Sequence, residues 1–339
     1  MPGSGERAYV YAKACGIIGR SFVGKRILQL GALSRLSELD RLVFSLNARD
    51  LPERELLVDL ERRIIGRTAK QIVTIIDSFA RPPEFLVRLL RSYEYGDIKN
   101  LINALAAGEP KAPVFTDIGR FRTLRVEAYP DIKAMLRDTE FDWLLKEDLQ
   151  NPASSGGDQG LLQTRLDRQY YTSLWGSLLS LPRNDRKTAE KLLSEEISLR
   201  NAAWALRLRT YYGMSPQEIR ERLVLIESQG ALAADALSSL SLALDNPSDW
   251  ASWKRAGFLN PARPGESWTV DPRCFQNAAS EYLYRLARVS FRRRPFSLDT
   301  VTCFIKLKQF EEDLLTSVAE GLGLGMPAGD IFALLEVAP

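Results

Sequence analysis

The stretch from Glu195 to Ile226 has the pattern of two helices joined by a tight turn, and it constrains the fold more strongly than any other part of the chain. The first helix carries large side chains at spacings of seven, four and three, which places them on one helical face: Ile197, Trp204, Leu208 and Tyr211. Gly213 follows, and glycine adopts the left-handed conformation that ends a helix at little steric cost. The pattern therefore predicts a helix that ends just before Gly213.

A second helix is predicted directly after this turn. Ser215 can cap its N-terminus, Glu218 completes a capping box, and Pro216 fits the first turn because its missing N–H has no helical partner there. The apolar face of this helix is formed by Ile219, Leu223 and Ile226. The whole stretch is thus predicted to be a helical hairpin.

The same hairpin pattern recurs before and after this stretch. Residues 97–105 match residues 198–206 position by position, and both segments place Asn after a basic residue, at Asn100 and Asn201. A weaker third copy begins at Phe310 and has Asp313 at the Asn position, while Gly325–Ile331 repeats the spacing of Gly213–Ile219. Because Asn is a middling helix former, its recurrence indicates a structural side-chain hydrogen bond between helices.

A repeat period of about a hundred residues is too long for a short-motif solenoid and indicates a triplicated helical domain. Chance similarity between amphipathic helices is the alternative explanation. The predicted domains are residues 1–114, 115–228 and 229–339.

Strand patterns are nearly absent from the chain, so the predicted fold class is all-α, with three similar helical bundles. Pro52 is expected to open one helix, with Glu53 and Glu55 in its first turn, where negative charge is favourable. Other helices are expected at Tyr9–Leu36, Leu36–Phe44, Phe85–Leu105, Asp131–Leu149, Leu161–Leu181, Leu232–Leu244 and Phe275–Phe291.

The chain of 339 residues contains no histidine, and this absence excludes several kinds of active site. A serine or cysteine triad of the usual kind needs an imidazole base, and a histidine-containing zinc site needs an imidazole ligand. The three cysteines are far apart and odd in number, which argues against a disulfide framework. We expect no cofactor and no metal, and the absence of histidine argues against an enzyme.

Two local patterns suggest chemistry only weakly. Gly19–Arg26 is nearly a phosphate-binding loop, but Arg26 replaces the Ser or Thr that holds magnesium, and the flanking residues look helical rather than strand-like. We therefore expect no direct nucleotide binding. Asp167 and Glu281 lie in corresponding helices and could form an acid/base pair, although solvated helix carboxylates are the simpler interpretation.

Three places are candidates for partner binding. Arg292, Arg293 and Arg294 could hold phosphate or an acidic partner, or could simply form a charged turn before Pro295. The two hairpin tips add Tyr212, Met214 and Met326. The net charge of +3 does not indicate nucleic-acid binding, and the scattered tryptophans Trp204, Trp250, Trp253 and Trp268 are expected in core or interdomain packing.

Several loose motifs, taken in order, resemble one family: the C subunit of the A/V-type rotary ATPases, called subunit d in eukaryotic enzymes. The motifs are Tyr93–Asn100, Leu166–Tyr171, Ile197–Asn201, Tyr211–Met214, Arg294–Ser297 and Phe304–Leu314. Each is weak alone, but their order and spacing cover nearly the whole chain. Asp313 replaces the Asn that the third copy has in the family pattern.

This resemblance implies a funnel of three similar domains around a pseudo-threefold axis. It implies a non-catalytic central-stalk subunit that binds the central-shaft subunits and the membrane proteolipid ring, and transmits torque for ATP-coupled proton or sodium transport. Its place would be the cytoplasmic face of a membrane. No apolar run is long enough to span a bilayer, and no signal-peptide pattern is present.

Two other functions remain open from the sequence alone. One is a soluble helical scaffold that binds acidic partner proteins. The other is a carboxylate-dependent enzyme, which would require two close carboxylates with perturbed pKa values in a deep pocket.

Overall fold

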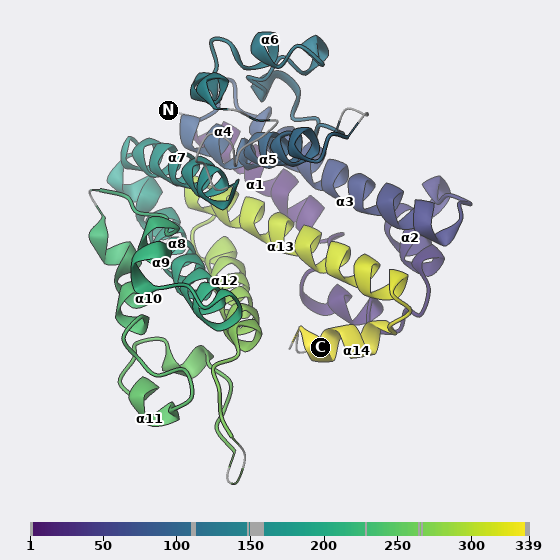
Figure 1. Cartoon of the computed structure of the whole chain (residues 1–339). Helices are drawn as coiled ribbons and strands as arrows, with labels where there is room; N and C mark the ends of the chain where they lie inside the picture. The colour runs from purple at the N-terminus through teal and green to yellow at the C-terminus, as the bar shows by residue number, and fades with distance from the viewer. Residues whose placement is uncertain are drawn as a thin grey trace. The chain divides into compact units, whose positions relative to one another are not determined.

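The computed structural model describes residues 3–109, 113–147, 149, 159–227, 229–263, 265 and 267–335. These described residues form helices and connecting turns and contain no β-strand (Figure 1). The all-α prediction is confirmed.

The longer helices carry most of the buried side chains. The α-helices are α1 (Ser4–Ile18), α2 (Leu36–Phe44), α3 (Glu53–Ile76), α4 (Glu84–Leu90), α5 (Ser92–Ala106), α6 (Ile132–Leu136), α7 (Gln159–Leu179), α8 (Arg183–Tyr212), α9 (Pro216–Glu221), α10 (Ala234–Ser239), α11 (Pro247–Trp250), α12 (Pro272–Arg293), α13 (Leu298–Gly323) and α14 (Ala328–Leu334). Short 3-10 helices connect them: η1 (Gly24–Gln29), η2 (Ser45–Asn47), η3 (Gly119–Phe121), η4 (Val126–Ala128), η5 (Asp142–Lys146), η6 (Gly230–Ala233) and η7 (Ala256–Phe258).

The chain divides into two compact units, and its first and last segments belong to the same one. Unit 1 consists of Met1–Pro82, Asn184–Leu192 and Arg273–Pro339, and unit 2 consists of Pro83–Arg183 and Leu193–Pro272. Unit 1 therefore combines parts of all three predicted domains. The three-domain division at residues 114 and 228, and its pseudo-threefold arrangement, stay a prediction.

Unit 1 is built around α13, which packs along α3 and also contacts α1, α2 and α14 (Figure 1). Most positions of α13 are buried on successive turns, so the helix is enclosed on several sides. Gly321 allows α14 to fold back closely, because a Cβ at this position would overlap the side chain of Ile331. The hairpin of α13 and α14 thus depends on a residue without a side chain.

The core of unit 1 also contains an ion pair between Lys308 and Glu311, whose side chains are each 1% exposed. Lys308 donates to Ser21 Oγ at 3.0 Å, and Glu311 Oε1 accepts from the backbone N–H of Phe22 at 2.7 Å. Burial, with a smaller effect of Arg67, lowers the pKa of Lys308 to about 6. The pair ties the turn that follows α1 to the centre of α13.

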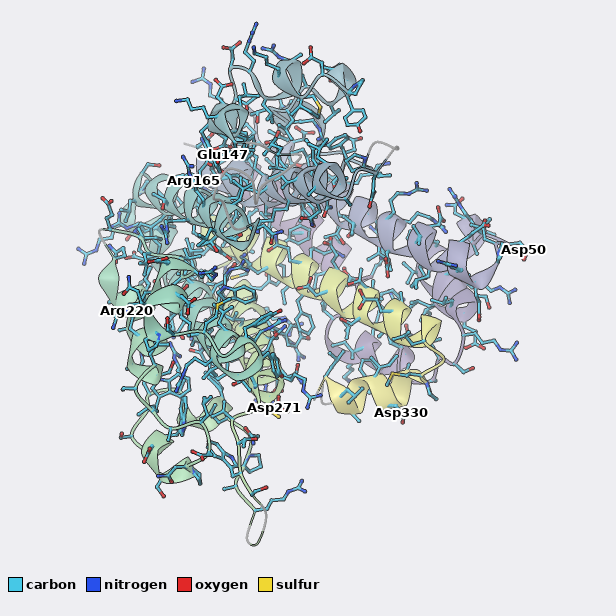
Figure 2. All side chains as sticks on the ribbon, viewed as in Figure 1. Asp50, Glu147, Arg165, Arg220, Asp271 and Asp330 are labelled. Carbon is cyan, nitrogen blue, oxygen red and sulfur yellow. The ribbon has the colours of Figure 1, made fainter. Side chains whose placement is uncertain are left out.

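Unit 2 packs α4 and α5 against α7. Edge-to-face aromatic pairs fill the space between these elements, with ring centroids of Tyr95 and Tyr170 5.2 Å apart. On the outer side of α7, Arg165 pairs with Glu147 at 3.0 Å (Figure 2). Trp250 and Trp253 are buried and edge-to-face, as the sequence predicts for core tryptophans.

Several local predictions are confirmed. Helix α2 has the predicted bounds, and α3 begins after Pro52 with Glu53 and Glu55 in its first turn. Gly213 ends α8 with a φ of 61°. The capping box between Ser215 and Glu218 is present at the start of α9.

Other predicted helices are wrong. The helix expected over Tyr9–Leu36 ends at Ile18, and Gly24 takes a φ of 64° that no α-helix contains. The helix expected over Asp131–Leu149 ends at Leu136, because Asp138 is left-handed with a φ of 61°. The apolar face predicted for α8 is also wrong in part, since Trp204 is 37% and Tyr211 51% exposed, while Asn201 and Ala205 are buried.

Candidate partner-binding surfaces

The turn between α8 and α9 presents aromatic side chains at its surface. Gly213 allows the chain to reverse, and the N–H of Met214 donates to Leu208 O at 3.2 Å. Tyr212 is 62% exposed and Tyr211 51% exposed. This turn is therefore rigidly capped and leaves two phenol rings accessible.

Met214, which the sequence places at the same tip, has a different environment. It is half-buried and packs against a cluster of buried side chains: Ala205, Leu208, Ile219, Leu223, Ala236 and Leu240. Its contacts anchor the turn to unit 2, so Tyr212 is the more accessible of the two predicted residues.

The turn between α13 and α14 is similar in backbone but not in side chains. Gly325 has a φ of 78°, and the N–H of Met326 donates to Gly321 O at 2.9 Å. Met326 is half-buried, while Leu324 is 80% exposed. Asp330 lies in the first turn of α14 (Figure 2). Sequence reasoning missed Leu324 because it falls between the helix pattern and the glycine.

The arginines of the turn between α12 and α13 are all exposed, but they are not equivalent. Arg294 Nη1 lies 3.2 Å from Asp299 Oδ2, and the Arg294 carbonyl accepts from the Thr300 hydroxyl at 2.7 Å. Asp299 is fully buried and accepts the backbone N–H of Ala189 at 3.1 Å. Arg294 thus helps to hold the start of α13, whereas Arg292 and Arg293 lie at the end of α12 with exposed side chains.

Phe296, in the same turn, is a residue that the sequence analysis missed as a surface feature. It has a φ of 67°, an uncommon conformation for a bulky side chain, and it is 49% exposed. Its ring meets Tyr11 edge-on at 5.3 Å between centroids. Backbone strain of this kind often marks a functional position, although it does not identify the function.

The three positions of the repeat motif occupy different environments. Asn201 is 1% exposed, its amide donates to Val224 O at 2.9 Å, and its Oδ1 accepts the N–H of Val224 at 2.8 Å. Asn100 and Asp313 are exposed. A structural hydrogen bond is present at Asn201, but it holds the segment after α9 rather than a second helix.

On α5, the side chain of the matched motif that holds a later segment is Asp97, one turn before Asn100; Glu94, just before the motif, accepts the N–H groups of Thr123 and Leu124 as well. The Asp97 carboxylate accepts from the backbone N–H of Thr116 at 2.9 Å and pairs with Arg122 at 3.3 Å. Burial raises the pKa of Asp97 to about 6, although the hydrogen bonds from Thr116 and the charge of Arg122 oppose this effect. In both matching motifs a buried side chain therefore holds a later backbone segment, but it does so from different positions of the motif.

Lys99 and Arg200, the basic residues of the two matching motifs, bind the same carboxylate. Lys99 Nζ lies 2.6 Å from Asp167 Oδ1, and Arg200 Nη2 lies 2.7 Å from Asp167 Oδ2. Glu281, in unit 1, pairs instead with Arg285. Asp167 and Glu281 thus pair with different cations, which gives no support to an acid/base pair between them. Within the described residues, no cluster of three potential metal ligands is found.

The segment that resembles a phosphate-binding loop follows helix α1 rather than a buried strand. The N–H of Gly24 donates to the Tyr284 hydroxyl at 2.8 Å, and the Arg26 guanidinium donates to Arg20 O. Backbone donors of a phosphate-binding loop point at the anion. Here one of these backbone donors, the N–H of Gly24, is already hydrogen-bonded to Tyr284.

Comparison with known proteins gives a family for the chain. The sequence pattern that defines the ATP synthase (C/AC39) subunit family matches residues 47–333. An uncharacterized protein of Treponema pallidum (strain Nichols) is 29% identical over 321 residues, which cover 94% of this chain and 92% of the relative. In the described part of the chain, no helix combines the length and apolar character needed to cross a membrane.

Proposed function

The chain belongs to the ATP synthase (C/AC39) subunit family, the C or d subunits of A/V-type ATPases, and we propose that it is the central-stalk subunit that joins the central shaft to the proteolipid ring. In this role it transmits torque for ATP-coupled proton or sodium transport and catalyses no reaction itself. It acts at the cytoplasmic face of the membrane. The observation that carries this proposal is the family match over most of the chain.

The physical requirement for such a subunit is stiffness, because a part that bends stores torque instead of transmitting it. The core of unit 1 supports this role, since α3 and α13 pack along each other and both helices carry many buried side chains. Close-packed interiors have low compressibility and transmit strain. Long buried helices are therefore suitable for mechanical coupling.

The second requirement is a pair of interfaces with apolar anchors and charged rims. Tyr212 at the tip of α8, Leu324 at the tip of α13, and Arg292 and Arg293 at the end of α12 are exposed and meet this description. We assign partner binding to these residues. Met214 and Met326 are assigned to the support of the two tips.

Affinity purification of the tagged chain from membranes of its own organism tests this proposal. We expect the proteolipid and the shaft subunits to co-purify in defined proportions after gentle detergent extraction. A tagged chain that runs alone under conditions that keep the rest of the ATPase intact would contradict the proposal.

A further inference from the structure

Helix α12 has an exposed basic face in unit 1. The exposed residues follow one another at spacings of three and four along the last two to three turns: Arg285, Arg288, Val289, Arg292, Arg293 and, just beyond the helix, Phe296. These spacings place the arginines on one side of the helix. We call these six residues the α12 basic face.

The net positive charge of this helix is larger than that of the whole chain. Helix α12 contains five arginines and one glutamate, a formal charge of +4, whereas the whole chain carries +3. The remaining residues are therefore close to electrically neutral. A local excess of this size is a feature of one surface and not of the overall composition.

Most of the charge on the α12 basic face is available to a partner. Arg285 pairs with Glu281, and Arg294 beyond the helix pairs with Asp299. Among the described residues, no ion pair is found for Arg288, Arg292 or Arg293. Three guanidinium groups on exposed residues thus have no ion pair with a carboxylate of the described residues.

Phe296 and Val289 add an apolar contribution next to these charges. Val289 is 50% exposed and lies between Arg288 and Arg292, while Phe296 is 49% exposed and is held in a left-handed conformation beside Tyr11. Aromatic and arginine side chains are the most frequent energetic centres of protein interfaces. The face therefore combines charge for orientation with small apolar anchors.

We propose that the α12 basic face docks an acidic α-helix of a partner protein, with carboxylates at three- and four-residue spacing. Arg285 and Arg292 are seven residues apart, about 10 Å along the helix axis at 1.5 Å per residue. A partner helix with the same spacing of Asp or Glu can pair with the arginines in register, and each guanidinium can bind a carboxylate with two hydrogen bonds. This inference rests on the proposed function, since it gives the chemistry of one of the proposed interfaces.

An anionic membrane surface fits the structure less well. A helix that lies in a membrane inserts its apolar face into the lipid. On the side of α12 opposite the arginines, Tyr284, Ala287 and Phe291 are already buried. Attraction of three arginines to anionic lipid alone provides about 3 kcal/mol, at about 1 kcal/mol for each charge. That is too weak for stable binding.

The test uses the full chain and two synthetic helical peptides of about 20 residues. One peptide carries Glu at three- and four-residue spacing on one face with Leu beside it, and the other has the same composition with Glu distributed around the helix. The variant that reverses the charge of the α12 basic face, called the stripe variant, is Arg288→Glu with Arg292→Glu and Arg293→Glu. The matched control is Arg54→Glu with Lys70→Glu and Arg81→Glu, three exposed positions of the same unit. It changes the net charge equally.

We expect the wild type and the control to bind the striped peptide at least about tenfold more tightly than the distributed one, and the stripe variant to lose this preference. Thermal unfolding shows whether both variants are folded, and exposed charges should change it little. Equal binding of the two peptides, or equal loss in the control, would overturn the inference. The inference would also be overturned if the wild type bound phosphatidylserine vesicles, the stripe variant did not, and neither peptide bound to the wild type.

Failure of this inference and failure of the proposed function give different results. A chain that co-purifies with the proteolipid ring but shows no preference between the peptides contradicts only the α12 docking surface. A chain that prefers the striped peptide but does not co-purify with the ring contradicts only the proposed function.

Discussion

Helices α5 and α8 carry matching sequence motifs at residues 97–105 and 198–206, and within each motif one buried side chain holds a later segment of backbone. On α8 this side chain is the amide of Asn201, which makes two hydrogen bonds with Val224. On α5 it is the carboxylate of Asp97, which accepts from Thr116. The motif alignment pairs Asn201 with Asn100, but Asn100 is exposed.

The difference shows that sequence similarity between two helices does not locate equivalent contacts. A buried acceptor is needed wherever a returning segment would otherwise leave its N–H groups unsatisfied. The position of that acceptor depends on where the segment returns, and the two segments return differently after Gly108 and Gly213. An amide and a carboxylate can both accept a hydrogen bond from the returning backbone, but only the carboxylate titrates.

The largest effect is expected from Asn201→Leu. The substitution keeps the branched side-chain skeleton but leaves the buried N–H and C=O of Val224 without partners, which should lower the free energy of unfolding by about 3 kcal/mol. Chemical denaturation and hydrogen exchange at the Val224 amide measure this change. Asn100→Leu is the matched control and should change stability by no more than about 0.5 kcal/mol. Equal effects of the two substitutions would mean that the two asparagines do have the same role.

Asn201→Asp should transfer a pH dependence to α8. At neutral pH the introduced carboxylate cannot donate to Val224 O, so we expect a loss of about 2 to 3 kcal/mol. At low pH the protonated carboxyl can donate again, and the variant should regain part of its stability relative to wild type. Denaturation at about pH 7.5 and about pH 4.5 compares the two states. A difference from wild type that stays constant between these pH values would contradict the amide's donor role.

Asp97→Asn should remove a pH dependence from α5. Because burial raises the pKa of Asp97 from 3.8 to about 6, the folded state binds this proton more tightly than the unfolded state. The stabilisation that the folded state gains from the bound proton of Asp97 is complete below about pH 4 and is lost as the pH rises through about 6. The introduced amide does not titrate, so the Asp97→Asn variant does not lose this stabilisation. Its free energy of unfolding minus that of wild type should therefore rise by about 2 kcal/mol when the pH is raised from about 4.5 to about 7.5. Parallel pH profiles of the two proteins would show that Asp97 titrates normally.

The smallest effect is expected at Asp167, where the two motifs meet. Asp167→Ala removes the partners of both Lys99 and Arg200, and these side chains are 24% and 45% exposed. Partly exposed ion pairs contribute little, so the loss should be about 1 kcal/mol. Lys99→Ala and Arg200→Ala should each reproduce about half of it. A loss above about 3 kcal/mol would indicate that Asp167 has a larger structural role than its two ion pairs explain.

The sequence predicted helix boundaries correctly where the residues that start or end the helix lie next to the boundary. The start of α3 at Pro52, the end of α8 at Gly213 and the capping box from Ser215 to Glu218 all depend on residues within one turn of the boundary. The interruption at Asp138 was not predictable, because a left-handed aspartate has no distinctive sequence signal.

The partner-binding surfaces stay a prediction. The run of three arginines suggested them, but it gave no sign that Arg294 pairs with Asp299, which is oriented by the distant Ala189. Likewise, Glu311 meets Phe22 across most of the chain. Contacts between distant segments depend on tertiary packing, and a single sequence contains no local pattern for them.

Measurement of ion transport for each ATP hydrolysed, with and without this chain, tests the central-stalk role most directly. Membrane vesicles from a strain that lacks the chain are compared with vesicles in which the wild-type chain has been restored. We expect ATP hydrolysis without ion transport, or release of the soluble motor from the membrane, when the chain is absent, and normal coupling after its restoration. Unchanged ion transport per ATP in vesicles that lack the chain would contradict the central-stalk function.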